Sequence, residues 1–303
     1  MKKTSEPIVF FGSGPVAAKA LELLHQDFEI AAVITKPQPA HHKELFPVLK
    51  TSHELGLKTL TVSSKAELSA LFARQPVESR VGVVIDFGII ISQDVIDYFP
   101  LGIVNSHFSL LPQWRGADPI TFAILSGQAE TGVSLMLIVE KLDEGPLLAQ
   151  RPHPIAPTAT TPSLTAELIQ LSHDMLMETL PGYLSGALRP YSQDLSTPPT
   201  YSRKLTKADS IIDWHKPAEQ LEREIRAFIE WPKSRTRLAG KEVIITKARA
   251  EKMQQRAGSR ERPRTVHITQ EKEIAVQTGD GILIIERLKP SGKNEMSAEA
   301  FIR

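Results

Sequence analysis

The chain has 303 residues, 41% of them apolar and 23% charged, which is typical of a globular protein long enough to form two domains. It contains no cysteine, so a disulfide framework, thiolate catalysis and a cysteine-ligated metal are all excluded. Its apolar runs are shorter than the roughly 18–20 residues of a membrane helix, and its first residues lack the pattern of a signal peptide. We therefore expect a cytoplasmic protein that does not associate with membranes.

The net charge of +1 conceals a difference between the two halves of the chain. Residues 1–189 carry 14 Lys and Arg against 19 Asp and Glu, whereas residues 190–303 carry 22 against 16. An acidic first half joined to a basic second half predicts that the C-terminal part binds a polyanion. On charge alone, a solvated surface of mixed charge explains these numbers equally well.

Short apolar strands alternate with amphipathic helices in the first half of the chain. We predict strands at residues 8–11, 30–35, 59–62, 81–85 and 101–104, and helices at residues 18–24, 48–55 and 65–74. This alternation predicts a doubly wound, mostly parallel α/β sheet of the Rossmann-like class. Farther along, the sequence predicts a helix at 119–126, strands at 131–139 and 146–150, and a long helix at 162–184.

The first predicted strand runs into a glycine-rich turn, Gly12-Ser13-Gly14. Such a turn is found in dinucleotide-binding enzymes, so an oxidoreductase is one alternative. However, the second strand ends at Lys36-Pro37, with no acidic residue placed to bind a ribose. We therefore interpret Gly12 and Gly14 as residues that allow a tight turn and close packing.

Two strand ends are candidates for a shared ligand pocket. The strand at 81–85 ends at Asp86 and Phe87, and the strand at 101–104 ends at Asn105 and His107. Ligands bind outside the carboxyl ends of the strands in open α/β sheets. Residues two apart in an extended segment point to the same side, so Asn105 and His107 are expected to project together.

An amide beside an imidazole suits a reaction in which a carbonyl oxygen gains negative charge, because one group donates a hydrogen bond and the other moves a proton. Downstream, the turn between residues 141 and 145 carries Asp143 and Glu144. A carboxylate beside His107 would fix the tautomer of the imidazole and raise its basicity. Sequence physics alone does not choose between the two acids. Taken alone, Asn105 also fits a turn residue and His107 a buried core histidine.

The segment from residue 190 to 207 is rich in proline, serine and threonine, which predicts a linker. Beyond it we predict a helix at 217–228 and short strands at 243–245, 265–269, 274–277 and 282–285, with a hairpin turn at Gly279-Asp280-Gly281. Several short strands in fewer than one hundred residues predict a small OB-like β-barrel, a fold that often binds nucleic acid.

The run Asn105-x-His107-x-Ser-Leu-Leu-Pro112, followed by Trp-Arg-Gly-Ala and by the Asp143 turn, resembles the shared site of the folate-dependent formyltransferases. In the second half, segments 201–209, 225–228 and 279–281 and the pair Trp231-Pro232 resemble the methionyl-tRNA formyltransferase branch of that family. The resemblance covers nearly the whole chain. It implies a catalytic domain at 1–189, a linker at 190–207 and an OB-like, tRNA-binding domain at 208–303.

The resemblance also implies a reaction. The formyl group of the co-substrate 10-formyltetrahydrofolate would pass to the α-amine of methionyl initiator tRNA, for translation initiation. Asn105 and His107 would stabilise the oxyanion, and the acid would be Asp143, the first of the two neighbours. No metal is expected, because the pair His41-His42 lacks a third ligand. We expect a monomer.

Two sets of binding residues follow from the same resemblance. The folate is expected to contact two segments, namely Phe87, Gly88, Ile89 and Ile90, and Ser109, Leu110, Leu111 and Pro112. The tRNA is expected to contact the basic residues Lys36, Lys43, Arg203, Lys204 and Lys207. The loop after Pro37 is shorter and less basic than the corresponding insertion in the family.

Two other functions compete with this interpretation. The first is a formyltransferase that acts on an amino sugar-nucleotide or another small amine, which the short loop after Pro37 favours and the basic second half opposes. The second is a non-catalytic nucleic-acid-binding protein. The presence of Asn105, His107 and Asp143 together argues against the second alternative, because a binding scaffold has no need of all three.

Overall fold

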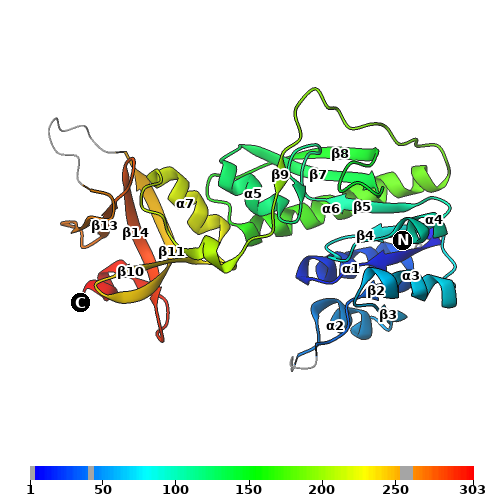
Figure 1. The fold of residues 1–303 in the computed structure, drawn as a ribbon, viewed down its shortest axis with the longest axis horizontal. Coiled ribbons are helices and arrows are strands. Elements are labelled where there is room, and N and C mark those ends of the chain that lie inside the picture. Colours follow the sequence, from blue (N-terminus) through cyan, green and yellow to red (C-terminus); the bar gives the residue numbers. More distant parts are fainter. Residues whose placement is uncertain (1–3, 40–43, 253–261) are drawn as a thin grey trace. The chain divides into compact units, whose positions relative to one another are not determined.

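A computed structural model describes residues 4–39, 44–252 and 262–303 of the chain. These residues form two compact units. The first unit contains Met1–Gly116, Thr131–Pro154 and Thr165–Tyr201, and the second contains Ala117–Glu130, Ile155–Leu164 and Ser202–Arg303. Each unit has its own sheet (Figure 1).

The first unit is built on a seven-stranded sheet with the order β3-β2-β1-β4-β5-β7-β8. The strands β1 to β5 pair in parallel, and β7 runs antiparallel to β5. This arrangement confirms the predicted doubly wound, mostly parallel sheet. The strands are β1 (Thr4–Phe11), β2 (Phe28–Thr35), β3 (Thr59–Thr61), β4 (Val81–Val84), β5 (Ile103–His107), β7 (Glu130–Leu137) and β8 (Leu147–Pro154).

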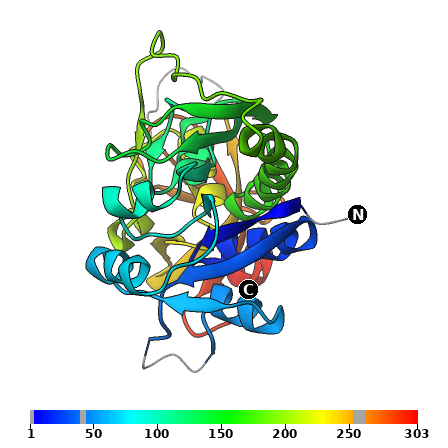
Figure 2. The same ribbon diagram turned by 90° about the vertical axis from the view of Figure 1, so that its right-hand side faces the viewer.

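Helices cover both faces of this sheet (Figure 2). They are α1 (Pro15–Asp27), α2 (Pro47–Glu54), α3 (Lys65–Arg74), α4 (Gln93–Tyr98) and α6 (Thr161–Leu184). On one face α6 lies against α1, where His173 Nε2 is 3.1 Å from Asp27 Oδ2. On the other face, α3 and α4 pack on the side chains that point away from α6, among them Val9 and Phe11 of β1.

The close contacts of Gly12 and Gly14 confirm their interpretation as packing residues. A Cβ atom at Gly12 would lie 2.5 Å from the Ala17 Cβ and 2.7 Å from the Phe10 ring. A Cβ atom at Gly14 would lie 2.0 Å from Asp86 Oδ2. The carboxylate of Asp86 therefore lies against the start of α1, the position at which a dinucleotide pyrophosphate would approach the helix, and this negative charge disfavours the oxidoreductase alternative.

The second unit is an antiparallel half-barrel with the strand order β10-β11-β14-β13-β12, to which β15 adds by pairing with β14. This confirms the predicted OB-like domain. Its strands are β10 (Ser234–Leu238), β11 (Lys241–Glu251), β12 (Val266–Ile268), β13 (Ile274–Gln277), β14 (Ile282–Pro290) and β15 (Met296–Ser297). Its helices are α5 (Pro119–Ser126), the 3-10 helix η1 (Lys207–Ser210), α7 (Ala218–Ala227) and α8 (Ala298–Ile302).

The core of the second unit lies between α7 and the half-barrel. Leu221 and Ile225 of α7 pack against apolar side chains of β11, β13 and β14. The same helix reaches α5, because Arg223 Nε donates a hydrogen bond of 3.2 Å to the carbonyl oxygen of Leu125. Two further strands, β6 (Arg115–Gly116) and β9 (Tyr201–Ser202), pair with each other.

Among the described residues, no helix is both long enough and apolar enough to cross a membrane. Within the same residues, no group of three or more His, Cys, Asp or Glu side chains is placed to hold a metal ion.

Candidate active site

The strand β5 carries both Asn105 and His107, so it continues beyond the predicted end at residue 104. Between them, Ser106 points to the face covered by α6, where its Oγ lies 2.6 Å from Ser172 Oγ. Because side chains alternate along a strand, Asn105 and His107 project from the opposite face. Asn105 is half-buried, and His107 is buried. Asn105 and His107 therefore project from the same face of the sheet, as the sequence predicts.

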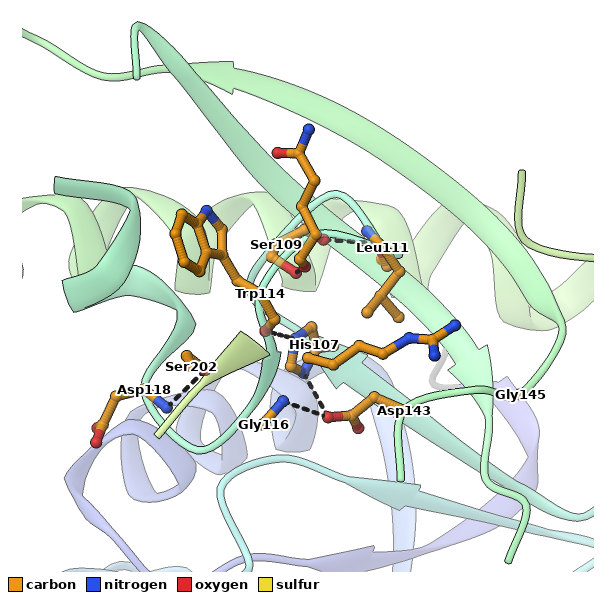
Figure 3. A network of polar contacts seen from close by, with 12 residues as sticks. His107, Ser109, Leu111, Trp114, Gly116, Asp118, Asp143, Gly145 and Ser202 are labelled. Atoms are coloured by element: carbon orange, nitrogen blue, oxygen red, sulfur yellow. Dashed lines mark hydrogen bonds and ion pairs between the residues drawn. The ribbon is translucent and has the colours of Figure 1, made fainter. Parts of the chain in front are cut away.

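Both ring nitrogens of His107 have defined neighbours (Figure 3). Nε2 lies 2.9 Å from the carbonyl oxygen of Trp114. A carbonyl oxygen only accepts hydrogen bonds, so Nε2 carries the hydrogen and donates it. Nδ1 lies 4.0 Å from Oδ2 of Asp143. In the neutral ring, Nδ1 is therefore the nitrogen with the free lone pair, and it faces a carboxylate.

Asp143 is 8% exposed and is held by the backbone of the segment that also contains Trp114. The N–H of Gly116 donates a hydrogen bond of 2.7 Å to Asp143 Oδ2. The neighbouring acid, Glu144, instead pairs with the guanidinium of Arg115, with its Oε1 3.0 Å from Nη1. Asp143 is thus the acid that lies beside His107, and Glu144 points to a different partner.

The turn that carries Asp143 depends on a glycine. A Cβ atom at Gly145 would lie 1.7 Å from the carbonyl oxygen of Leu137, so a larger residue there would displace the turn. Asp143 itself has a φ of 54°, in the left-handed region that a side chain normally avoids. Such a conformation persists only where the surroundings hold it.

The turn from Ser109 to Gln113 is fixed by two polar side chains from the neighbouring strands. Ser134 Oγ donates to the carbonyl oxygen of Ser109 at 2.6 Å and accepts from the N–H of Leu111 at 3.0 Å. Gln150 Nε2 donates to the carbonyl oxygen of Leu111 at 2.7 Å. The hydroxyl of Ser109 donates to the carbonyl oxygen of Gln113 at 2.5 Å. Sequence reasoning missed Ser134 and Gln150, because nothing in their strands marks them as polar contacts of a distant turn.

The other predicted folate segment follows β4. The Phe87 ring is buried and packs edge-on against Phe11, with 5.6 Å between ring centroids. The carbonyl oxygen of Phe87 accepts a hydrogen bond of 2.8 Å from the Ser13 hydroxyl. Gly88 has a φ of 64°, and Ile90 is 75% exposed. Residues 87–90 are therefore anchored in the core by Phe87 and expose the apolar side chain of Ile90.

The basic residues predicted to bind tRNA have different surroundings. In the first unit, the side chain of Lys36 reaches Gly88. A Cβ atom built at Gly88 would lie 3.0 Å from Lys36 Nζ. Lys43, together with the His41-His42 pair, lies outside the described residues. In the second unit, Lys204 and Lys207 are exposed.

Arg203 is already engaged within its own unit. Its Nη1 donates to Asp209 Oδ2 at 2.9 Å, its Nη2 donates to Asp209 Oδ1, and its guanidinium lies 6.0 Å from the centroid of the Phe122 ring. Hydrogen bonds from Arg203, followed by those from Thr206, hold the pKa of Asp209 well below its ordinary value. The side chain of Arg203 is 60% exposed, so this ion pair lies at the surface.

Comparison with known proteins places these residues in a family. The family model for formyl transferase matches residues 7–180, and the model for the formyl transferase C-terminal domain matches residues 204–303. The chain belongs to the formyl transferase family. The first match includes Asn105, His107 and Asp143, and together the two matches span both units of this formyl transferase.

Curated relatives match the formyl transferase along nearly its whole length. It is 41% identical to the methionyl-tRNA formyltransferase of Roseiflexus castenholzii over 302 residues, which cover 98% of this chain and 95% of the relative. It is 35% identical to the methionyl-tRNA formyltransferase of Bdellovibrio bacteriovorus over 303 residues, which cover 98% and 95%.

Solved structures share its fold. An N-formyltransferase from Helicobacter canadensis, in complex with folinic acid and dTDP-3-aminofucose, superposes with a TM-score of 0.68 at 18% identity, covering 93% of this chain and 98% of that one. WlaRD, a sugar 3N-formyl transferase, superposes with a TM-score of 0.69 at 19% identity, covering 96% and 100%. At these identities the likeness concerns the fold alone.

Proposed function

We propose that this formyl transferase moves a formyl group from 10-formyltetrahydrofolate to the α-amine of methionyl initiator tRNA. Relatives that are 41% and 35% identical and carry the name methionyl-tRNA formyltransferase support this substrate. The observation that carries the chemistry is the position of Nδ1 of His107, 4.0 Å from the buried carboxylate of Asp143.

Each of the three polar side chains has a distinct role in this proposal. The amide N–H of Asn105 donates to the oxygen that gains negative charge when the amine attacks. The sequence also assigns this role to His107, but the only N–H of its neutral ring, on Nε2, is engaged by the Trp114 carbonyl oxygen. Nδ1 of His107 accepts the proton that the amine loses and later supplies it to the departing nitrogen. The carboxylate of Asp143 stabilises the imidazolium that exists between these two events. Removing one oxyanion donor typically lowers kcat by about 10²–10³-fold.

The folate, when bound, supplies the formyl group. We propose that the backbone of residues 87–90 and the turn at residues 109–112 hold it, with Ser109, Leu110, Leu111 and Pro112 forming the second wall. Among the described residues, the N–H groups of Gly88, Ile89 and Ile90 donate to no protein acceptor, so they fit the polar edge of a pterin. The exposed side chain of Ile90 fits its flat apolar surface.

Binding of the tRNA is assigned to basic residues of both units. We propose Lys36 and Lys43 in the first, and Arg203, Lys204 and Lys207 in the second, as contacts to phosphate groups. The catalytic domain would comprise residues 1–189, the linker residues 190–207, and the tRNA-binding domain residues 208–303. We propose that the enzyme acts as a monomer in the cytoplasm.

The experiment is a formylation assay with 10-formyltetrahydrofolate and charged initiator tRNA, with amino sugar-nucleotides as competing acceptors. We expect formyl-methionyl-tRNA as the product, with little effect of the competitors. Formylation of the sugar in preference to the tRNA would instead assign the enzyme to small amines. No formyl transfer to either acceptor would contradict the proposal.

Single variants assign the roles. His107→Ala and Asp143→Ala are expected to lower kcat by about 10²–10⁴-fold, the usual contribution of a positioned acid–base group. Binding of tRNA by both variants should stay close to that of the wild type and should weaken as salt is raised. Turnover at the wild-type rate in both variants would refute the assignment.

A further inference from the structure

The segment from Tyr191 to Tyr201, which the sequence predicts to be part of a linker, contacts both turns that surround His107. It belongs to the same compact unit as the active site. At one end, Tyr191 forms a β-bridge with Leu147, and their backbone N–H and C=O groups exchange hydrogen bonds of 2.7 and 2.9 Å. The segment is therefore fixed to the sheet before it crosses the two turns.

Gln193 holds the turn that carries the carboxylate. Its Nε2 donates to the carbonyl oxygen of Asp143 at 2.7 Å and to that of Gly145 at 3.0 Å. Its Oε1 accepts a hydrogen bond of 2.8 Å from Nη2 of Arg115. Arg115 in turn pairs with Glu144. One half-buried amide thus connects the backbone on both sides of Glu144 to the neighbouring turn.

Thr200 holds the other turn. Its hydroxyl accepts a hydrogen bond of 2.9 Å from the N–H of Trp114, and its carbonyl oxygen accepts one of 2.9 Å from the N–H of Arg115. Its own N–H donates to the carbonyl oxygen of Pro112 at 3.3 Å. These three bonds fix the peptide groups on either side of Trp114, whose carbonyl oxygen is the hydrogen-bond acceptor for His107.

The two residues that contact the His107 ring share an unusual backbone conformation. Trp114 and Asp143 both have a φ of 54° although neither is glycine. Left-handed backbone at such residues is maintained only by surrounding contacts. At Trp114 the contact is with Thr200, and at Asp143 it is with Gln193. The same short segment therefore supports both neighbours of the imidazole.

We propose that Gln193 and Thr200 are positioning residues for formyl transfer. They act through Asp143 and Trp114, and they set where the two nitrogens of His107 lie relative to the reacting groups. This inference rests on the proposed function of His107 and Asp143. A misplacement of about 1 Å in such a constellation can cost about 10²-fold in rate.

The test compares isosteric variants in the full-length enzyme. Thr200→Val removes the acceptor for the Trp114 N–H, and Gln193→Met removes both the donor and the acceptor of the amide. Each is expected to lower kcat by about 10–100-fold and to leave KM for both substrates within about threefold. Thr200→Ser, which retains the hydroxyl, should restore kcat to within about threefold of the wild type. The matched controls are Thr197→Val, in the same exposed segment, and Gln170→Met, on α6.

Two outcomes would overturn the inference. One is wild-type kcat in both Thr200→Val and Gln193→Met. The other is equal loss in Thr200→Val and Thr200→Ser, which would mean that the hydroxyl is not what matters. If Gln193→Met is too unstable to assay, Gln193→Glu serves in its place, because it keeps the acceptor for Arg115 but cannot donate to the two carbonyl groups.

A readout that does not depend on activity separates this inference from the proposed function. Hydrogen exchange of the free protein should show faster exchange across residues 112–116 in Thr200→Val than in the wild type or Thr197→Val. Unchanged exchange across residues 112–116 would contradict the positioning role of Thr200, even if the enzyme is a formyltransferase. If the wild type does not formylate but the exchange difference is present, the proposed function is contradicted, and Thr200 still supports the turn.

Discussion

Nε2 of His107 donates a hydrogen bond of 2.9 Å to the carbonyl oxygen of Trp114. This contact assigns a different task to each ring nitrogen. Nε2 is committed to the backbone, and Nδ1, which faces Asp143 at 4.0 Å, is left for the proton transfer that we propose. A backbone carbonyl thus orients the imidazole that we propose to be catalytic, while the carboxylate lies close enough to stabilise its charged form.

The tautomer of His107 is the first prediction. In neutral His107 the hydrogen should reside on Nε2, because the Trp114 carbonyl oxygen can only accept. Nitrogen-15 NMR of protein labelled at histidine would show a protonated Nε2 and an unprotonated Nδ1, with His107→Gln used to assign the signals. A hydrogen on Nδ1 in the neutral form would contradict the orientation of the ring.

Gly145→Ala is expected to lower kcat strongly. The new Cβ would lie 1.7 Å from the Leu137 carbonyl oxygen, so the turn that carries Asp143 must shift and change the position of Asp143 relative to His107. By comparison with other misplaced catalytic groups, a loss of about 10²-fold is expected in steady-state kinetics. Gly182→Ala is the control, because its Cβ would make only an ordinary contact of 3.5 Å. An active Gly145→Ala enzyme would show that the turn tolerates displacement.

Ser134→Ala is expected to destabilise the fold. The change leaves the Leu111 N–H and the Ser109 carbonyl oxygen, both buried, without their hydroxyl partner. An unsatisfied buried group costs about 1–3 kcal/mol, so the free energy of unfolding measured with urea should fall by that amount. Ser185→Ala, which removes one exposed hydrogen bond to Gly182, should change it by less than about 0.5 kcal/mol. Equal effects of the two substitutions would argue against a fixed turn.

Asp209→Asn should change how stability depends on pH. The pKa of Asp209 is lowered in the folded protein, chiefly by hydrogen bonds from Arg203. A carboxyl group with a lowered folded pKa stabilises the protein above its unfolded pKa of about 3.9, and this stabilisation is lost as the pH falls through the folded value.

The free energy of unfolding of the wild type should therefore exceed that of Asp209→Asn by a constant amount between pH 5 and 7, and the difference should shrink below about pH 4. Denaturant titrations at several pH values would measure it. Asp97→Asn, which changes an exposed carboxylate on α4, controls for the loss of one negative charge. A difference that grows as the medium becomes more acidic would have the wrong sign.

Local signals in the sequence determined many of the elements. The helix α3 was predicted at its observed bounds, because Ser64 accepts a hydrogen bond from the N–H of Glu67 and so caps the start. The helix α5 was also predicted at its observed bounds, between Pro119 and Gly127. By contrast, β10 was missed. Its sequence Ser-Arg-Thr-Arg-Leu carries two exposed arginines, because it lies at the end of the strand order, next to β11.

The sequence by itself determined that Asn105 and His107 share one face, because a strand repeats every two residues. It did not determine which acid faces the imidazole, and tertiary structure decided this: Asp143 lies beside His107, while Glu144 pairs with Arg115. The contacts of Gln193 and Thr200 with the two turns could likewise not be predicted from the sequence, because their segment has the composition of a linker. Periodicity and capping act over a few residues, whereas these contacts join turns that are tens of residues apart, and only the folded chain brings them together.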